Sequence, residues 1–314
     1  MPLENLTNLA SLKNLASLKN LTTETPNPRT ADLDLMSPLE FAKVMNDENI
    51  HVFEAVEKAL PEIAKTIGIV ARQFKAGGRL IYAGAGTSGR LGLMDAVECV
   101  PTFGVDHGLV IGLIAGGERA FVKAVEGAED SKELCAEDLQ RLAFSAKDVF
   151  VGIAASGRTP YVIGGLEYAN ALGAETVAVA CNYGSEIGKI AKTCIEVDAG
   201  SEVLTGSTRL KAGTAQKIIL NMISTGAMIQ TGKVYKNLMV DVLTTNKKLV
   251  DRARRIVMQV TGADYEKADT VLNETHNKVK PAIVMIINQC SLDRAQNILK
   301  ENNGLIRPPP AVEA

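Results

Sequence analysis

Apolar positions recur at helical spacing in the segment that precedes Gly77. Between positions 52 and 74 they step by three or four residues, which places them on one face of a helix. They are Val52, Val56, Leu60, Ile63, Ile67, Val70 and Phe74. Pro61 is expected either to divide this segment into two helices or to lie in a first turn, since proline disrupts a helix interior. The pair Gly77-Gly78 predicts the end of the helix.

Short apolar runs alternate with helical segments in the next part of the chain. The runs predict five strands, at 80–83, 109–114, 149–154, 176–181 and 194–197. Helices are expected between them, from about Arg90 to Cys99, from about Arg119 into Leu139, and up to Leu172. Strands separated by helices of this length indicate parallel crossovers. We therefore expect an α/β fold with a doubly wound, five-stranded parallel sheet and flanking helices.

The last third of the chain is patterned only for helices. One helix is expected from about Lys211 to Thr231, with its inner side formed by Ala212, Ala215, Ile218, Ile219, Met222 and Ile223. After Leu249 the helical patterns are short, and Asp264 and Ser291 are expected N-caps. The expected apolar anchors there are Ile283, Ile286, Ile287, Ile298 and Leu299. This pattern predicts a small C-terminal helical subdomain.

The chain begins with a duplication of six residues, LASLKN at 9–14 and again at 15–20. Leucines there recur every three residues, which drifts around a helix instead of forming one stripe. We interpret the segment as a peripheral extension, followed by a polar connector at 22–29. Three parts are therefore expected: an extension at 1–30, the sheet domain with its N-terminal helices at 31–246, and the helical subdomain with its tail at 247–314.

Composition excludes several classes of function. A formal net charge of −2 over 314 residues leaves no basic stripe, which argues against a nucleic-acid partner. The five cysteines include no CxxC pair, so neither a zinc site nor a disulfide framework is expected. No apolar stretch reaches the ~18–20 residues that span a membrane, and the N-terminus is not patterned as a signal peptide. We expect a cytoplasmic protein without a metal, a cofactor or a membrane partner.

The chemistry-bearing pattern begins at the end of the first predicted strand. Residues 84–89 spell GxGxxG between a strand and a helix, which is typical of a dinucleotide site. Two features favour a terminal phosphate instead. Thr87 and Ser88 add consecutive hydroxyls, and the junction Ser156-Gly157-Arg158-Thr159 repeats the design after the third strand. Two ordinary tight turns would account for the glycines but not for both pairs of hydroxyls.

Both loops are expected at the carboxyl ends of parallel strands, where ligands bind in open α/β sheets. Two hydroxyl-rich loops around one phosphomonoester explain both patterns. A third hydroxyl cluster at 205–209 precedes a helix and is expected to form a neighbouring wall. The predicted phosphate-binding residues are Gly86, Thr87, Ser88, Ser156, Gly157, Thr159 and Ser207. Lys211 is a further candidate that meets a phosphate or a carboxylate, or is solvated.

Several long runs in matching order carry a resemblance. They are GAGTSGRLG at 84–92, DAVECVPTFGV at 95–105, IAGGE at 114–118, AVEGAED at 124–130, VGIAASGRTPYVI at 151–163 and KAGTAQKIILNMISTG at 211–226. From about Thr22 to near Arg307 the chain resembles the N-acetylmuramic acid 6-phosphate etherases. One departure is Val100, where that family commonly has proline. The resemblance implies a sugar isomerase (SIS), flavodoxin-like fold, a sugar-phosphate ligand and a homodimer.

The resemblance also implies an activity and two catalytic residues. Such enzymes cleave the C3 lactyl ether of N-acetylmuramic acid 6-phosphate to D-lactate and N-acetylglucosamine 6-phosphate, by elimination and water addition in cell-wall recycling. Through DAVEC and VEGAED, Glu98 resembles the acid that protonates departing lactate, and Glu129 resembles the base at C2. Sequence spacing alone does not separate Glu129 from Glu126 and Asp130.

Glu98 is expected near the C-terminal end of its helix, where the helix dipole disfavours a negative charge. An apolar surround of Val97, Val100 and Phe103 would raise its pKa further.

Two alternatives remain open: an aldose–ketose isomerase on the same fold, and a non-enzymatic sugar-phosphate sensor such as the glucokinase regulatory proteins. A sensor needs the hydroxyl loops but neither glutamate, so the presence of both favours the enzyme.

Overall fold

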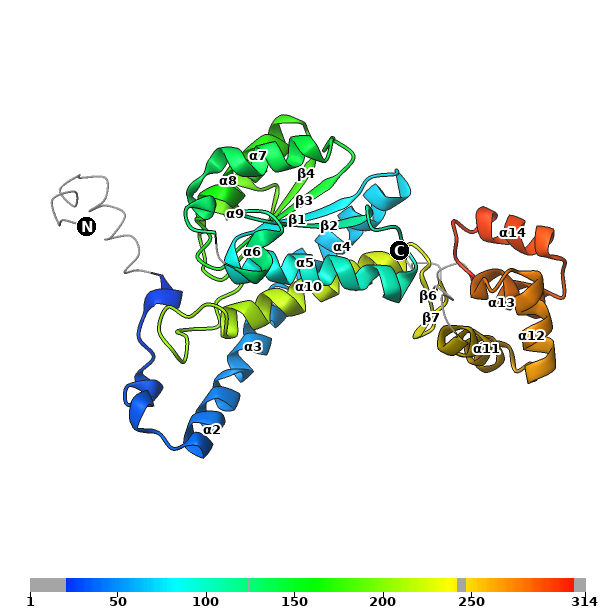
Figure 1. Cartoon of the computed structure of the whole chain (residues 1–314), viewed down its shortest axis with the longest axis horizontal. Helices are drawn as coiled ribbons and strands as arrows, with labels where there is room; N and C mark the ends of the chain where they lie inside the picture. The colour runs from blue at the N-terminus through cyan, green and yellow to red at the C-terminus, as the bar shows by residue number, and fades with distance from the viewer. Residues whose placement is uncertain (1–20, 124, 242–246, 308–314) are drawn as a thin grey trace. The chain divides into compact units, whose positions relative to one another are not determined.

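The computed structural model describes residues 21–123, 125–241 and 247–307 (Figure 1). The LASLKN duplication lies outside them. Contacts divide the chain into a first unit, 1–95 with 110–223, and a second unit, 96–109 with 224–314. Two long helices, α5 (Gly86–Phe103) and α10 (Lys211–Gln230), contribute residues to both units. The expected boundary between 246 and 247 stays a prediction, because residue 246 is outside the described ranges.

A five-stranded parallel sheet forms the centre of the first unit. Its strands are β1 (Leu80–Gly84), β2 (Val110–Ile114), β3 (Val149–Ala154), β4 (Glu175–Ala180) and β5 (Thr193–Glu196). They lie in the order β2-β1-β3-β4-β5, and every pair is parallel. The predicted doubly wound sheet is therefore confirmed. The strand order reverses between β1 and β3, and ligands bind at that point in folds of this topology.

Helices cover both faces of this sheet. Apart from α5 and α10, the helices of this unit are α2 (Pro38–Glu48), α3 (Ile50–Lys58), α4 (Leu60–Lys75), α6 (Arg119–Val122), α7 (Lys132–Arg141), α8 (Pro160–Ala171) and α9 (Glu186–Ile190), of which α2 and α3 lead away from the sheet. In Figure 1, α7 and α8 lie above the sheet, and α4, α5 and α10 lie below it. Pro61 lies in the first turn of α4, as predicted, and Gly77 follows the end of that helix with a φ of 80°.

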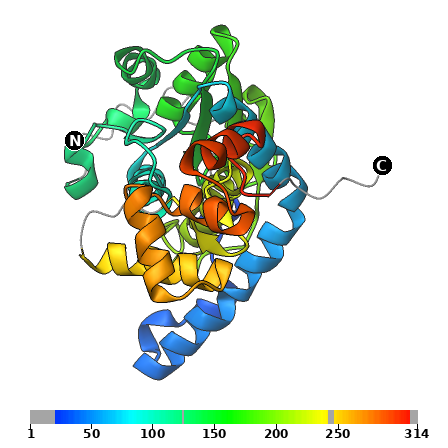
Figure 2. The ribbon, with the colours of Figure 1, turned by 90° about the vertical axis from the view of Figure 1, so that its right-hand side faces the viewer.

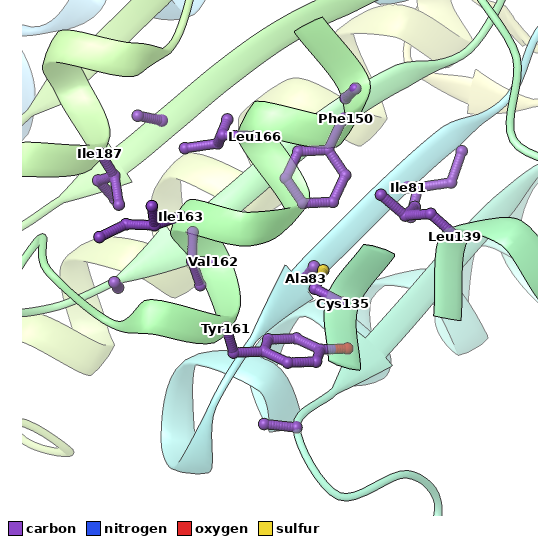
Figure 3. Close-up of a cluster of buried hydrophobic side chains, with 14 of the residues drawn as sticks. Ile81, Ala83, Cys135, Leu139, Phe150, Tyr161, Val162, Ile163, Leu166 and Ile187 are labelled. Atoms are coloured by element: carbon purple, nitrogen blue, oxygen red, sulfur yellow. The ribbon is translucent and has the colours of Figure 1, made fainter. Parts of the chain in front are cut away.

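A hydrophobic core cluster lies between the sheet and the pair α7–α8 (Figure 3). Ile81 and Phe150 point from β1 and β3 toward Leu139 and Leu166, and all four are fully buried. The two helices approach very closely, since a Cβ built at Gly164 would lie 1.8 Å from the Lys132 carbonyl oxygen. The aliphatic composition predicted such a core, because parallel strands are covered on both faces.

The helix expected from Arg119 into Leu139 is wrong. The structure has the short helix α6, then the 3-10 turn η5 (Ala128–Asp130), then α7. Gly127 has a left-handed φ of 75°, which ends any helical path there, and the Ser131 side chain accepts a hydrogen bond from the Leu134 N–H as a new N-cap. The break places Glu129 in a turn instead of in a helix.

The polar connector at 22–29 is part of the packed structure. It forms the 3-10 turns η2 (Thr22–Glu24) and η3 (Pro28–Thr30), followed by η4 (Leu33–Leu35). The Thr22 hydroxyl donates to Asp198 Oδ2 at 2.9 Å, and the Thr30 hydroxyl donates to the Val203 carbonyl at 2.8 Å. The segment therefore lies against the chain that follows β5.

The second unit contains α11 (Lys247–Thr261), α12 (Tyr265–Glu274), α13 (Val279–Asn288), α14 (Leu292–Glu301) and a hairpin of β6 (Val234–Tyr235) and β7 (Leu238–Met239) (Figure 2). Asp264 and Ser291 are N-caps, as predicted. Ile283 is fully buried, but Ile287 is 48% exposed, so it is not an anchor within this chain. Among the described helices, none has the length and apolar character to cross a membrane.

One buried carboxylate fixes the start of two strands. Asp148 Oδ1 accepts hydrogen bonds from the Arg79 backbone N–H and from Arg79 Nε, and Oδ2 accepts from Nη2 at 2.8 Å. Asp148 is 2% exposed. Burial alone would raise the pKa of this carboxyl, but the hydrogen bonds and charge of Arg79 outweigh burial and hold the pKa below its usual range.

We predict that Asp148→Asn lowers the free energy of unfolding by about 2 kcal/mol at pH 7, because it weakens charge-assisted hydrogen bonds to Arg79. A lowered folded-state pKa stabilises the fold above the unfolded value of about 3.9, and this contribution is lost as the pH falls through the folded-state pKa. The difference between wild type and variant should therefore shrink below about pH 4. Urea unfolding across pH, with the exposed Asp106→Asn as the control, measures it; a difference that does not change with pH contradicts the assignment.

Candidate functional site

The first predicted loop joins β1 to α5 through a very close backbone contact. A Cβ at Gly84 would lie 2.8 Å from the Gly89 nitrogen, and one at Gly89 would lie 2.5 Å from the Gly84 oxygen. Only glycine fits at either position. Gly86 starts α5 with a φ of 52°. The first N–H groups of α5, which have no partner within the helix, therefore lie at the carboxyl end of β1 and favour an anion.

A pocket of about 180 Å³ opens beside this loop, entirely within the first unit. Its lining combines Ala85, Gly86 and Arg90 from the loop with Glu126 and Glu129 from the turn after α6. Glu129 therefore lies close to the predicted phosphate loop. Glu126 lines the same pocket, so geometry leaves it as a rival for the role of base.

Arg90 has a structural role at this pocket. Its Nε donates to the Phe121 carbonyl at 2.8 Å, and its Nη2 donates to the Ala120 carbonyl at 2.7 Å. These two bonds hold the end of α6 against α5. They fix the chain that leads into the turn carrying Glu129. They also direct the guanidinium of Arg90 toward backbone oxygens.

The second loop follows β3, which pairs with β1 so that Gly84 lies opposite Ile153. Gly157 has a φ of 73°, and a Cβ there would lie 2.3 Å from Ser185 Cβ. Thr159 is the N-cap of α8, but its side chain makes no cap hydrogen bond. Within the described chain, the hydroxyls of Ser156 and Thr159 form no hydrogen bond to another residue, so both are available to a ligand.

The third hydroxyl cluster meets the first loop across the start of α10. A Cβ at Gly213 would lie 3.4 Å from the Thr208 oxygen and 3.5 Å from Thr87 Cγ2. Ser207 is half-buried in the same loop. Ser88 is buried, and its hydroxyl donates to Gln216 Oε1 at 2.9 Å. The three loops thus surround one edge of the sheet, and the phosphate-binding roles of their residues stay predictions.

Lys211 does not face an open phosphate site. Its side chain is 3% exposed, and its Nζ lies 2.7 Å from Glu48 Oε2. The backbone N–H groups of Lys211 and Ala212 both donate to the carboxylate of Glu202 at 2.9 Å. Of the sequence alternatives, the structure shows the carboxylate partner, and Lys211 is not solvated. Its predicted contact with phosphate remains untested.

The two carboxyls around Lys211 are shifted in opposite directions. Burial would raise the pKa of Glu48, but hydrogen bonds from Lys211 and Asn27, together with the charges of Lys211 and Arg29, lower it. Burial raises the pKa of Glu202 despite its two backbone donors. Glu48 therefore carries the negative charge that balances Lys211.

Glu98 lies twelve residues after Gly86 on α5, in the second unit, and it does not line the pocket of Glu129. The expected position near the C-terminal end of a helix is correct, although the helix continues through Pro101 to Phe103. The expected apolar surround is wrong for the described chain. Glu98 is exposed, and the neighbouring Val97 is 56% exposed.

The residues of the site offer hydroxyls and N–H groups for binding. One turn, which carries Glu126 and Glu129, offers carboxylates for chemistry. No group of three His, Cys, Asp or Glu side chains that could hold a metal ion occurs within the described residues. A phosphate monoester bound by the loops would lie beside a carboxylate that can remove a proton. No local motif marks Glu48, Glu202 or Gln216. The partners of Glu48 and Gln216 lie 163 and 128 residues away along the chain, and Glu202 accepts hydrogen bonds from backbone N–H groups nine and ten residues later.

We predict that Lys211→Met lowers the free energy of unfolding by about 3 kcal/mol, because it leaves the buried Glu48 without its main counter-charge. Lys217→Met, at an exposed position on the same helix, should change it by less than about 0.5 kcal/mol. Chemical denaturation of both variants measures the difference. Equal, small effects of the two substitutions would contradict the buried ion pair.

Two sequence families match parts of the chain. The glucokinase regulatory protein N-terminal SIS domain matches residues 62–170, and the SIS domain matches residues 130–225. Together with the strand order, these matches confirm the predicted SIS fold. Among solved structures, a phosphoheptose isomerase from Francisella tularensis is similar with a TM-score of 0.49 and 17% identity, over 62% of this chain and 100% of that one.

Curated relatives match almost the whole chain. An N-acetylmuramic acid 6-phosphate etherase of Clostridium botulinum (strain Loch Maree / Type A3) is 58% identical over 90% of this chain and 94% of its own length. Those of Bacillus cereus (strain 03BB102) and Cronobacter sakazakii (strain ATCC BAA-894) are each 56% identical over 91% of this chain, and over 97% and 96% of their own lengths. The chain therefore belongs to the N-acetylmuramic acid 6-phosphate etherase family.

Proposed function

We propose that this protein is a carbon–oxygen lyase that cleaves the C3 lactyl ether of N-acetylmuramic acid 6-phosphate. The products are D-lactate and N-acetylglucosamine 6-phosphate. Identity of 55–58% to etherases over about nine-tenths of the chain carries this assignment. The pocket that joins the first hydroxyl loop to Glu129 supports it, because it brings an anion site and a carboxylate together.

The loops after β1 and β3 bind the 6-phosphate in this proposal. The N–H groups at the start of α5, the Tyr161 N–H at the start of α8, and the hydroxyls of Thr87, Ser88, Ser156 and Thr159 are donors to its oxygens, together with Ser207 from the loop before α10. Opening of the sugar ring exposes an aldehyde at C1, which acidifies the proton on C2. The substrate is thereby held by its phosphate while its C2–C3 bond reacts.

Glu129 removes the C2 proton, and Glu98 protonates the ether oxygen as the C3–O bond breaks and lactate leaves. The carboxylate of Glu98 then takes a proton from water, whose oxygen adds to C3 of the enal, and the C2 carbon regains a proton. The overall reaction consumes one water. Glu129 is exposed in a 3-10 turn beside the loop, where its carboxyl group is accessible to a bound substrate.

Two further features belong to the proposal. The protein acts in the cytoplasm, where it recycles amino sugars of the cell wall, and it is a homodimer. The exposed apolar side chains of the N-terminal segment support a dimer: Leu35, Leu39, Phe41, Ile50, Phe53 and Leu60. The corresponding apolar side of α10, including Ala215, Ile219 and Ile223, is buried within the chain itself. Light scattering of the wild type and of Ile50→Glu/Phe53→Glu tests the dimer, and a wild-type monomer would refute it.

The activity is tested by mixing purified protein with N-acetylmuramic acid 6-phosphate and measuring D-lactate with a lactate dehydrogenase. We expect lactate from the phosphorylated substrate and none from the unphosphorylated sugar. Tight binding of the phosphosugar without lactate would refute the etherase and favour a sugar-phosphate sensor. Conversion of an aldose phosphate to a ketose phosphate without lactate would favour the isomerase.

We predict that Glu129→Gln and Glu98→Gln each lower kcat by about 10²–10⁴-fold, because each removes one proton-transfer group. The dissociation constant for N-acetylglucosamine 6-phosphate should change little, since neither side chain is needed to hold the phosphate. Glu126→Gln is the matched control, because Glu126 lines the same pocket. Loss of turnover in that variant, with normal turnover in Glu129→Gln, would assign the base to Glu126 instead.

A further inference from the structure

Gln216 is a buried polar side chain beside the first hydroxyl loop. It lies on the second turn of α10 and is 1% exposed. Its Oε1 accepts the hydrogen bond from the Ser88 hydroxyl at 2.9 Å. Its Nε2 is buried and has no hydrogen-bond partner among the residues that the structure describes. Buried donors without partners are rare in native proteins, so this nitrogen calls for a physical explanation.

The direction of the Ser88 hydrogen bond matters for a phosphate ligand. A serine hydroxyl has a single hydrogen, and here that hydrogen points to Gln216. Ionised phosphate oxygens are acceptors only. In this arrangement Ser88 therefore presents lone pairs, not a donor, to an anion at the start of α5. Ser88 as a whole residue is 7% exposed.

Rotation of the Gln216 amide by a half turn resolves both features. The terminal torsion of glutamine has two broad minima that exchange the oxygen and the nitrogen. After rotation, Nε2 donates to Ser88 Oγ, and the Ser88 hydrogen becomes free to point toward the loop. The unpartnered nitrogen gains an acceptor, and the serine becomes a donor.

The surroundings of Gln216 accommodate the rotated amide. The thiol of Cys181, which follows β4, interacts with the Gln216 side chain and donates to the Ala212 carbonyl at 3.6 Å. Burial raises the pKa of this thiol to about 12, so it keeps its proton at neutral pH. Its S–H group is a weak donor that can turn from the Ala212 carbonyl to the amide oxygen.

We propose that Gln216 is a positioning residue that sets the direction of the Ser88 hydroxyl. In the free protein Ser88 donates to Gln216; when the sugar phosphate binds, the amide rotates, Gln216 donates to Ser88, and Ser88 donates to a phosphate oxygen. No covalent bond forms or breaks. This inference rests on the proposed function, because the phosphate of the substrate is the anion that reverses the chain of hydrogen bonds.

The test compares Gln216→Met and Gln216→Glu in the D-lactate assay. Methionine keeps the length of the side chain but cannot donate, so we expect KM to rise about 5-fold with kcat unchanged, the size of one neutral hydrogen bond. A glutamate carboxylate has only acceptors, so the Ser88 hydroxyl continues to donate to it and does not donate to the phosphate. We therefore expect KM to rise about 10–100-fold. Gln230→Met, at the exposed end of the same helix, is the matched control and should leave KM unchanged.

A double-mutant cycle separates positioning from packing. Gln216→Met should raise KM in the wild-type background but add nothing in a Ser88→Ala background, because its effect passes through the Ser88 hydroxyl. A full additional rise in the Ser88→Ala background overturns the proposal. The proposal is also overturned if Gln216→Met unfolds at lower temperature but binds substrate normally. In that case Gln216 stabilises the fold and does not orient the Ser88 hydroxyl for binding.

The experiment also distinguishes failure of this inference from failure of the proposed function. Calorimetric binding of N-acetylglucosamine 6-phosphate gives a dissociation constant that needs no turnover. If the wild type binds it but releases no lactate, the etherase assignment fails, and the same cycle is completed on dissociation constants. If lactate is released but Gln216→Met leaves both KM and the dissociation constant unchanged, the inference about Gln216 fails alone.

Discussion

The contact between the end of β1 and the first turn of α5 is the constraint on which the site depends. Gly84 and Gly89 meet at distances that exclude a Cβ on either residue, so the chain reverses direction within one residue of the strand. The helix therefore starts at the sheet edge, and its free N–H groups lie where β1 and β3 end. The GxGxxG spacing is a consequence of this packing, and dinucleotide sites share the spacing because they share the packing.

In the proposed site, neutral donors face the phosphate. Arg90 is the only basic side chain that lines the described pocket, and its guanidinium binds the backbone oxygens of Ala120 and Phe121. Lys211 is paired with Glu48. A phosphate in this cradle depends on hydroxyls and N–H groups, whose direction then decides affinity. This dependence explains why a residue behind Ser88, and not only the serine itself, should influence binding.

Sequence patterns predicted the features that neighbouring residues determine. The five strands, the position of Pro61 in a first turn and the N-caps at Asp264 and Ser291 follow from local spacing and chemistry, and all are present. The helix expected through Gly127 was wrong because apolar spacing outweighed a glycine that adopts a left-handed φ. The partners of Lys211 and Ser88 lie 163 and 128 residues away, and only the folded sheet brings them together.

The three helix starts at this edge differ in one respect that favours a single phosphate position. The N–H groups that open α10 are occupied by the Glu202 carboxyl group, which accepts hydrogen bonds from the Lys211 and Ala212 N–H groups. At α8 the Thr159 side chain makes no cap bond, and α5 begins directly at Gly86. An anion is therefore attracted to the adjacent starts of α5 and α8 and not to α10. Because the protein's own carboxyl group fills one helix start, we expect the phosphate of the proposed substrate at the β1–β3 edge.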